Sequence, residues 1–299
     1  MIDWFSVPLE HAFMQHAFIA IILVGIMCGA TGVFVTLRGL AFMGDALSHA
    51  VFPGVVIAFL IGGNVVIGAL IAGTLVSLSI GVISQNQKLS GDTAIGVLFA
   101  GPFALGIALI SAQRTYTRDL ASFLLGSILG VSRSDLYLTG AVAAIVVGAI
   151  GLFRRELTIV AFDPTFARAT GINVWLIDQL FLVLLSLAIV ISLQTVGNIL
   201  VLAMLVTPAA TARLLTDRLR WMVALSSAIG ALSGVIGLYL SFHWNIASGA
   251  SVVLVATVAF LLVYLFSPRT GIVTATIRQR RHFPHPEDDR FSSAETMPS

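Results

Sequence analysis

Apolar runs of roughly 20 residues follow one another along almost the whole chain. A helix rises about 1.5 Å per residue, so each run is long enough to cross a hydrocarbon layer of about 30 Å. The composition agrees, because 58% of the 299 residues are hydrophobic and only 10% are charged. Soluble domains carry about 25% charged residues. The sequence therefore predicts an all-α, polytopic membrane protein, a helical bundle without a separate soluble domain.

The expected number of spans is eight to ten. A run at residues 121–131 is too short to cross a membrane alone and suits a re-entrant or interfacial helix, with a short buried crossing as the alternative. The longer runs have expected boundaries of 17–37, 45–62, 65–83, 94–111, 136–153, 175–195, 198–214, 222–241 and 246–266.

Basic residues at the span ends indicate the orientation, because cytoplasmic loops are enriched in arginine and lysine. Nine spans place the N-terminus outside and the C-terminus in the cytoplasm, although Arg114, Arg118 and Arg133 then remain outside. A tenth span would place both ends inside. The residues assigned to the cytoplasmic side are Arg38, Lys88, Arg154, Arg155, Arg168, Arg213, Arg218 and Arg220, together with the arginines of the tail.

Three parts of the chain differ in character. Residues 1–16 form an N-terminal segment, residues 17–266 the membrane-spanning domain, and residues 267–299 a cytoplasmic tail. The tail is too polar to bury a core and is expected to be largely disordered. The formal net charge of +2 is explained by arginines at loop ends, so no nucleic-acid partner is expected.

Several enzyme classes are excluded by inspection. Lys88 is the only lysine and follows Gln87, so the chain cannot contain a Gly-Lys-Ser/Thr phosphate loop. No histidine precedes a glutamate, which removes the His-Glu-x-x-His zinc peptidase pattern. We therefore expect a protein that is not an enzyme and has no cofactor of its own.

Asp45 and His49 are the most informative residues. They lie four positions apart at the start of an apolar run, so a helix projects both side chains from nearly one face. Ionisable groups in or beside a membrane need a partner or a function, and Asp with His is a common metal-ligand pair. Two ligands are too few for a transition metal, but a homodimer would supply two of each. The alternative is that Asp45 caps the helix and His49 donates to a backbone carbonyl.

A second segment predicts a short helix on the cytoplasmic side. Asp163 suits the cap, Pro164 the first helical position and Gly171 a left-handed stop, while Phe162 and Phe166 give an apolar edge. Such a helix either docks a partner or lies on the lipid headgroups.

A third segment combines polar residues with a proline. Gln194, Thr195 and Asn198 lie near span ends, where they either line a pathway or serve the helix ends. Pro208 lies within an apolar span, where it either serves packing or acts as a gate hinge.

Together these segments resemble the permease subunits of bacterial ATP-binding-cassette importers for zinc, manganese and iron. The likeness extends from about Gly25 to Phe266. The family patterns are Gly-Asp-x-Leu-x-His-Ala at 44–50, Asp-Thr-Ala-Ile-Gly at 92–96, Phe-Asp-Pro-x-x-Ala-x-x-x-Gly at 162–171, and Val-Gly followed by Pro-Ala-Ala-Thr-Ala within 196–212.

The resemblance implies a homodimer in the bacterial cell membrane that imports a divalent cation, manganese or zinc or else iron, by alternating access. Asp45 and His49 would be metal ligands near the dimer axis. A cytoplasmic ATPase subunit would bind the ATP, and an extracytoplasmic solute-binding protein would deliver the cation. The coupling helix at 163–171 would contact the ATPase through Phe162, Asp163, Pro164, Phe166, Ala167, Arg168 and Gly171.

Two other functions remain open from the sequence. A permease of the same architecture for a siderophore or cobalamin would need a wide apolar cavity instead of charged ligands. An ion-coupled secondary transporter would show inverted repeats with broken helices at matching positions, and no such repeat is evident.

Overall fold

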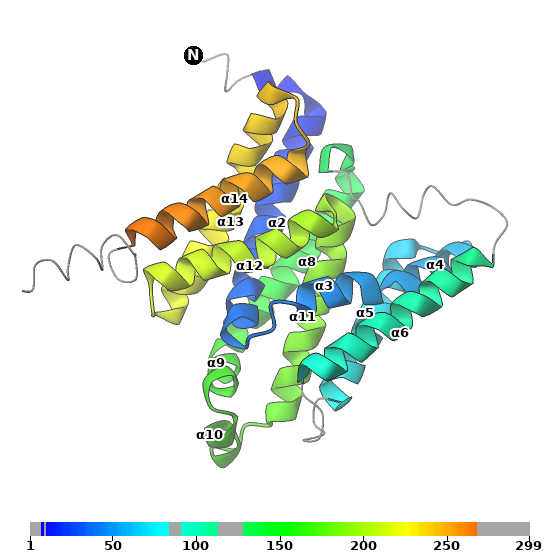
Figure 1. The fold of residues 1–299 in the computed structure, drawn as a ribbon, viewed down its shortest axis with the longest axis vertical. Helices are drawn as coiled ribbons and strands as arrows, with labels where there is room; N and C mark the ends of the chain where they lie inside the picture. Colours follow the sequence, from blue (N-terminus) through cyan, green and yellow to red (C-terminus); the bar gives the residue numbers. More distant parts are fainter. Residues whose placement is uncertain (1–6, 9, 84–90, 113–127, 268–299) are drawn as a thin grey trace, which may run out of the picture.

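The computed structural model describes residues 7–8, 10–83, 91–112 and 128–267, and within them every regular element is helical (Figure 1). The elements are α2 (Ala12–Leu37), α3 (Met43–Ala50), α4 (Phe52–Leu60), α5 (Val65–Ile83), α6 (Gly91–Ser111), η1 (Ile128–Gly130), α8 (Arg133–Leu152), α9 (Arg154–Phe162), α10 (Pro164–Ala169), α11 (Val174–Val196), α12 (Asn198–Leu215), α13 (Leu219–Trp244) and α14 (Ser248–Phe266).

The predicted membrane helices are present. Among the described residues, eight helices are long and apolar enough to cross a membrane, with α3 and α4 together forming one of them, and Ile95–Ser111 of α6 adds a shorter apolar helix. Several helices extend beyond the predicted runs: α2 begins at Ala12, within the predicted N-terminal segment, and α13 continues to Trp244. Polar residues end an apolar run without ending the helix. Residues 121–127 lie outside the described residues, so the role of the short run stays a prediction.

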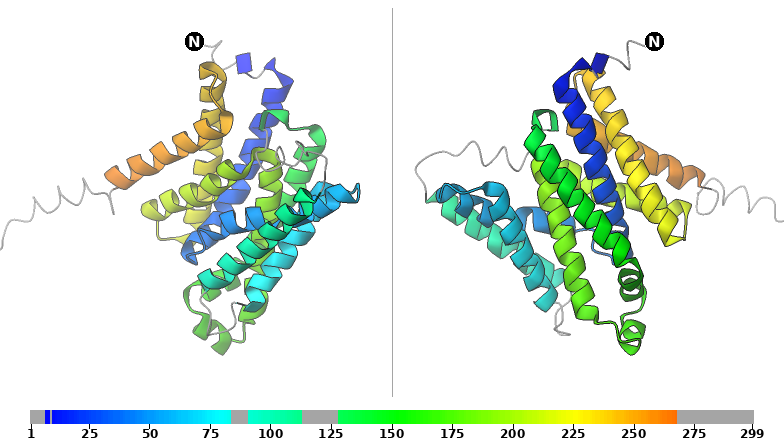
Figure 2. Two further views of the ribbon diagram at one scale, coloured as in Figure 1. Left: turned by 45° about the vertical axis from the view of Figure 1, so that its right-hand side comes forward. Right: turned by 180° about the vertical axis from the view of Figure 1, so that it is seen from behind.

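The helices alternate in direction across the bundle. The α2–α3, α8–α11 and α12–α13 connections lie on one side, and the α4–α5, α11–α12 and α13–α14 connections lie on the other (Figure 1). Arg38, Arg168 and Arg218 belong to the first side, together with the projecting α9 and α10 (Figures 1 and 2). The positive-inside rule assigns this side to the cytoplasm.

Helix α2 forms the centre of the bundle. Of its most apolar 18-residue window 78% is buried, against 17% for α14 at the periphery. Close packing of α2 against α13 uses small residues, because a Cβ on Gly29 would lie 2.8 Å from the Ser226 carbonyl oxygen. The Ser226 hydroxyl donates a 2.7 Å hydrogen bond to the Gly29 carbonyl. The Gly25/Gly29 and Gly230/Gly234 pairs thus serve helix contact.

One predicted span differs from the structure. The sequence predicted a single helix over 45–62, whereas the structure has α3 and α4 meeting at Val51. Pro53 explains the division, because it lacks the N–H that would bond to the His49 carbonyl and its ring disfavours a straight helix. The helical segment also begins at Met43, which places Asp45 inside the first turn instead of at its cap.

Candidate metal site

Helix α3 presents Asp45 and His49 on one face and anchors the other face in the core. Met43 and Leu47 are fully buried. Asp45 and His49 lie about half a turn away from them around the helix axis. Burial of Met43 and Leu47 therefore fixes the orientation of the helix and directs the two polar side chains away from the core.

The two polar side chains approach a third one from a distant part of the chain. His49 Nε2 lies 3.6 Å from Asp45 Oδ1 and 3.5 Å from the Asn198 side-chain nitrogen. Asn198 is the first residue of α12 and follows Gly197, at which α11 ends and the chain reverses. The turn between α11 and α12 thus brings Asn198 to the face of α3 that carries Asp45 and His49.

An aromatic wall limits the movement of the His49 ring. The ring centroids of Phe99 and Phe103 lie 5.5 and 5.1 Å from that of His49, both edge-on. His49 Nδ1 is buried and has no hydrogen-bond partner. The side chains of His49 and Asp45 are 29% and 45% exposed in the single chain. Both side chains are therefore partly exposed, whereas the Nδ1 atom of the imidazole is enclosed.

The alternative in which Asp45 caps the helix and His49 donates to a backbone carbonyl differs from the structure. Phe42 occupies the N-cap of α3 and no side chain caps the helix. His49 Nδ1 does not bond to a backbone carbonyl. Neither the cap nor the carbonyl bond that would explain Asp45 and His49 structurally is formed.

The arrangement has the chemistry and the spacing of part of a metal site. Ligand atoms that bind one ion at about 2.0–2.2 Å lie roughly 3–3.6 Å from one another. The separations around Nε2 are close to this range. Rotation of the Asn198 amide by half a turn replaces its nitrogen with a carbonyl oxygen, and the two assignments are indistinguishable by shape. Imidazole, carboxylate and amide oxygen together suit divalent cations such as Mn²⁺.

One copy of the chain supplies few ligands. In the part of the chain that the structure describes, no three His, Cys, Asp or Glu residues come together in a group that could hold a metal ion. Further ligands must come from water, from another molecule or from a second copy.

Two of the other pathway candidates make contacts with α8. The Gln194 amide donates to Asp135 Oδ1 at 3.3 Å, and the buried Thr195 hydroxyl lies 3.2 Å from that of Thr139. Both contacts join α11 to α8. Pro208 is buried inside α12, which continues past it to Leu215.

The short helix predicted at 163–171 forms as α10, from Pro164 to Ala169 with Asp163 as its N-cap. Asp163 Oδ1 accepts hydrogen bonds of 2.9 Å from the backbone N–H groups of Thr165 and Phe166. Pro164 occupies the first helical turn, and Gly171 has a φ of +83°. Phe162 and Phe166 are 69% and 54% exposed, while Ala167 is buried. The end of α9, with Phe162, and helix α10, with Phe166, thus carry exposed aromatic side chains at the projecting tip of the molecule (Figure 1).

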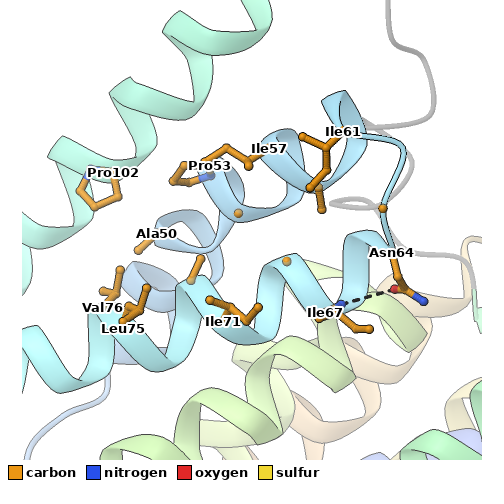
Figure 3. Close-up of a pocket in the computed structure, with 15 residues that line it drawn as sticks. Ala50, Pro53, Ile57, Ile61, Asn64, Ile67, Ile71, Leu75, Val76 and Pro102 are labelled. Atoms are coloured by element: carbon orange, nitrogen blue, oxygen red, sulfur yellow. Dashed lines mark hydrogen bonds between the residues drawn. The ribbon is translucent and has the colours of Figure 1, made fainter.

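An apolar cavity of about 480 Å³ lies beside the cluster, between α4 and α5 with Pro102 of α6 (Figure 3). Ala50, the neighbour of His49, reaches its edge. Among the described residues of its lining, Asn64 supplies the one polar side chain, whose oxygen accepts from the Val66 N–H at 2.9 Å. These described residues include no carboxylate or imidazole.

Comparison with known proteins decides the family. A model described as the ABC 3 transport family matches residues 10–267. The chain belongs to this family. The permease is 49% identical over 278 residues to the manganese transport system membrane protein MntC of Halalkalibacterium halodurans, covering 93% of this chain and 95% of that protein.

A second relative and a solved structure agree with this family assignment. The permease is 37% identical over 270 residues to a probable iron transport system membrane protein of Haemophilus influenzae, covering 89% of this chain and 98% of that protein. The solved structure titled PsaBC from Streptococcus pneumoniae in complex with Fab matches with a TM-score of 0.80 at 39% identity, covering 94% of this chain and 100% of that chain. The resemblance inferred from the four motifs is confirmed, and the chain is a multi-pass permease subunit of the bacterial cell membrane.

Two parts of the permease were missed from the sequence. Phe99 and Phe103 contact His49, and their spacing of four residues on one helix was the available signal. Asp178 lies in a membrane helix and pairs with Arg38 at 2.7 Å. An acidic residue within a predicted span is itself a signal, because it requires a partner.

Proposed function

We propose that this permease carries Mn²⁺ into the cell through a site formed by Asp45, His49 and Asn198. The observation that carries the proposal is the convergence of two ligand-type side chains, Asp45 and Asn198, at 3.6 and 3.5 Å from His49 Nε2. The name of the 49% identical relative supports manganese as the cargo. Iron is the second candidate, because the donor set also suits Fe²⁺ and a 37% identical relative is named for iron transport.

The working unit is a homodimer in which α3 of each copy faces the other across the pathway. Asp45 is 45% exposed in the single chain, and the cluster lacks enough ligands for a transition metal. A second copy would add another Asp, His and Asn. Two carboxylates would together balance the charge of a dication, while the small number of strong ligands keeps binding weak enough for release.

Energy for transport comes from a partner ATPase that docks on the cytoplasmic helix α10. The permease has no phosphate loop of its own, and its single lysine follows a glutamine. Phe162 and Phe166 offer exposed apolar contact area at the tip of the molecule, and Arg168 adds a cation beside them. A solute-binding protein delivers the metal at the opposite side, and closure of the ATPases alternates access.

The test is uptake of Mn²⁺ by proteoliposomes that contain the complex of permease and ATPase, supplied with metal-loaded binding protein. We expect Asp45→Ala and His49→Ala to abolish uptake while the complex still assembles and hydrolyses ATP. His16→Ala is the matched control, because His16 lies on α2, at a distance in sequence from the cluster. Bound Mn²⁺ and the mass of the purified complex are measured on the same samples, and a dimeric permease is expected.

Retained uptake in both variants would contradict the assignment of the site. Uptake of Fe²⁺ or Zn²⁺ in place of Mn²⁺ by the wild type would correct the cargo alone. Uptake of metal only as a chelate, or uptake without the ATPase, would favour one of the two other transporter classes.

A further inference from the structure

Arg38 and Asp178 form an ion pair that the proposed pathway does not use. Arg38 Nη1 donates to Asp178 Oδ1 at 2.7 Å, and the Arg38 side chain is only 10% exposed. Its guanidinium carbon lies 4.5 Å from the centroid of the Phe181 ring. Burial lowers the pKa of Arg38, and the carboxylate of Asp178 opposes that fall. The pair thus joins the cytoplasmic end of α2 to the first turns of α11.

Arg38 is tied rigidly to the helix that bears the metal ligands. It caps α2, and Gly39 follows with a φ of +70°. Two backbone bonds close the turn, from Gly39 N–H to Thr36 and from Leu40 N–H to Val35, which is the Schellman pattern. The Met43 N–H then bonds to the Leu40 carbonyl at 2.9 Å, at the start of α3. This short, hydrogen-bonded connection joins Arg38 to the start of the helix that bears Asp45 and His49.

Asp178 is tied in a similar way to the short cytoplasmic helix. The connection from α10 to α11 closes with bonds from Gly171 N–H to Arg168 and from Ile172 N–H to Ala167. Asn173 then caps α11 by accepting from the Leu176 N–H at 3.2 Å. Only a few ordered residues therefore separate α10 from Asp178.

Stability alone is a weak reason for this pair. An ion pair with one buried partner gains little over apolar residues of the same volume, because the Arg38 guanidinium loses its water while the Asp178 side chain stays 40% exposed. Arg38 Nε and Nη2 are also buried without partners, so the guanidinium is only partly satisfied. The pair does link the end of α2 directly to α11, although Arg38 and Asp178 are 140 residues apart in the chain.

We propose that the Arg38–Asp178 pair transmits movement of the ATPase-facing helix α10 to the metal-bearing helix α3, so that ATP hydrolysis is coupled to release of the cation. The inference rests on the proposed function. Arg38 and Asp178 are positioning residues that do not touch the metal.

The experiment compares Mn²⁺ uptake with ATP hydrolysis in the same proteoliposomes. Asp178→Asn keeps the shape of the side chain and removes its charge. We expect it to retain the assembled complex, the bound Mn²⁺ and most of the ATP hydrolysis, and to lower uptake per ATP about tenfold, within the 5–150-fold range of coupling between sites. The double exchange Arg38→Asp with Asp178→Arg restores the charge pair and is expected to recover part of the ratio. Glu156→Gln on α9 is the matched control for loss of a cytoplasmic carboxylate.

An unchanged ratio of uptake to ATP in Asp178→Asn would overturn the proposal. The same conclusion follows if uptake and hydrolysis fall in parallel with the amount of folded complex. If the permease with Asp178→Asn fails to assemble with the ATPase, the ratio of Mn²⁺ uptake to ATP hydrolysis is measured with Arg38→Lys instead. This variant keeps the positive charge and loses the planar guanidinium. The proposed function is judged separately, by wild-type uptake and by Asp45→Ala.

Discussion

At the scale of single residues, the tautomer of the His49 imidazole decides whether Nε2 can bind a metal ion. A metal at Nε2 requires the proton to be on Nδ1, and Nδ1 is buried without a partner. Metal-bound histidines usually donate this second N–H to a neighbour. In its absence the Phe99 and Phe103 rings hold the orientation of the imidazole, through edge contacts at 5.5 and 5.1 Å. Asn198 lies beside Nε2, at 3.5 Å, and is contributed by a different helix, α12.

Replacement of Asn198 tests this role. Asn198→Ala is expected to raise the Mn²⁺ concentration at half-maximal uptake by at least about 10–100-fold, because loss of a group that only supports a metal ligand already has this effect. Asn198→Asp supplies an oxygen ligand in the same place and should bind Mn²⁺ at least as tightly as the wild type. Uptake measured over a range of Mn²⁺ concentrations gives both values, with Asn245→Ala as the amide control. Equal half-maximal concentrations in all variants would exclude Asn198 from the site.

At the scale of helices, the contact between α2 and α13 sets the stability of the bundle. Between apolar helices in lipid the driving force is close packing, because the lipid is as apolar as the side chains. Gly29 permits that approach, and the Ser226 hydroxyl donates to its carbonyl at 2.7 Å. A second hydrogen bond runs from the Ser227 hydroxyl to the Ile26 carbonyl at 3.2 Å.

Gly29→Val should therefore destabilise the permease by at least about 1–3 kcal/mol, the usual cost of overpacking. A Cβ at this position would lie 2.7 Å from Ser227 Cα, which is backbone and cannot move aside. The control is Gly148→Val on α8, where an added Cβ meets nothing within 4 Å. Thermal unfolding in detergent measures the difference. Equal unfolding midpoints for the two variants would show that the α2–α13 contact accommodates the added side chain without loss of stability.

At the scale of the whole molecule, the two sides of the bundle differ in what they offer a partner. The cytoplasmic side carries most of the described arginines and the projecting α10 (Figure 2). Asp45 and His49 lie on α3, and the loop before α3 opens on that same side (Figure 1). A partner that moves α10 can therefore act on the cluster over a short path.

Docking of the ATPase on α10 predicts a specific loss of assembly. Phe166→Ala should reduce co-purification of the ATPase subunit with the permease at least about tenfold, because a central aromatic contact is worth 2 kcal/mol or more. Trp221→Ala removes another exposed aromatic residue from the same side and should leave assembly unchanged. The ratio of ATPase to permease after affinity purification is the measurement. Full recovery of the ATPase with Phe166→Ala would place the docking surface elsewhere.

Sequence and tertiary structure each determined a different part of this protein. Apolar runs, caps and stops are local, so the sequence by itself predicted the helical class, the membrane helices and α10 with Asp163 and Gly171 at its ends. Spacing along one helix also paired Asp45 with His49. Only the tertiary structure placed Asn198 beside His49 and Asp178 beside Arg38, because these partners are 149 and 140 residues apart. Such contacts depend on how helices cross, which is set by packing across the whole bundle and leaves no periodic signal in the chain.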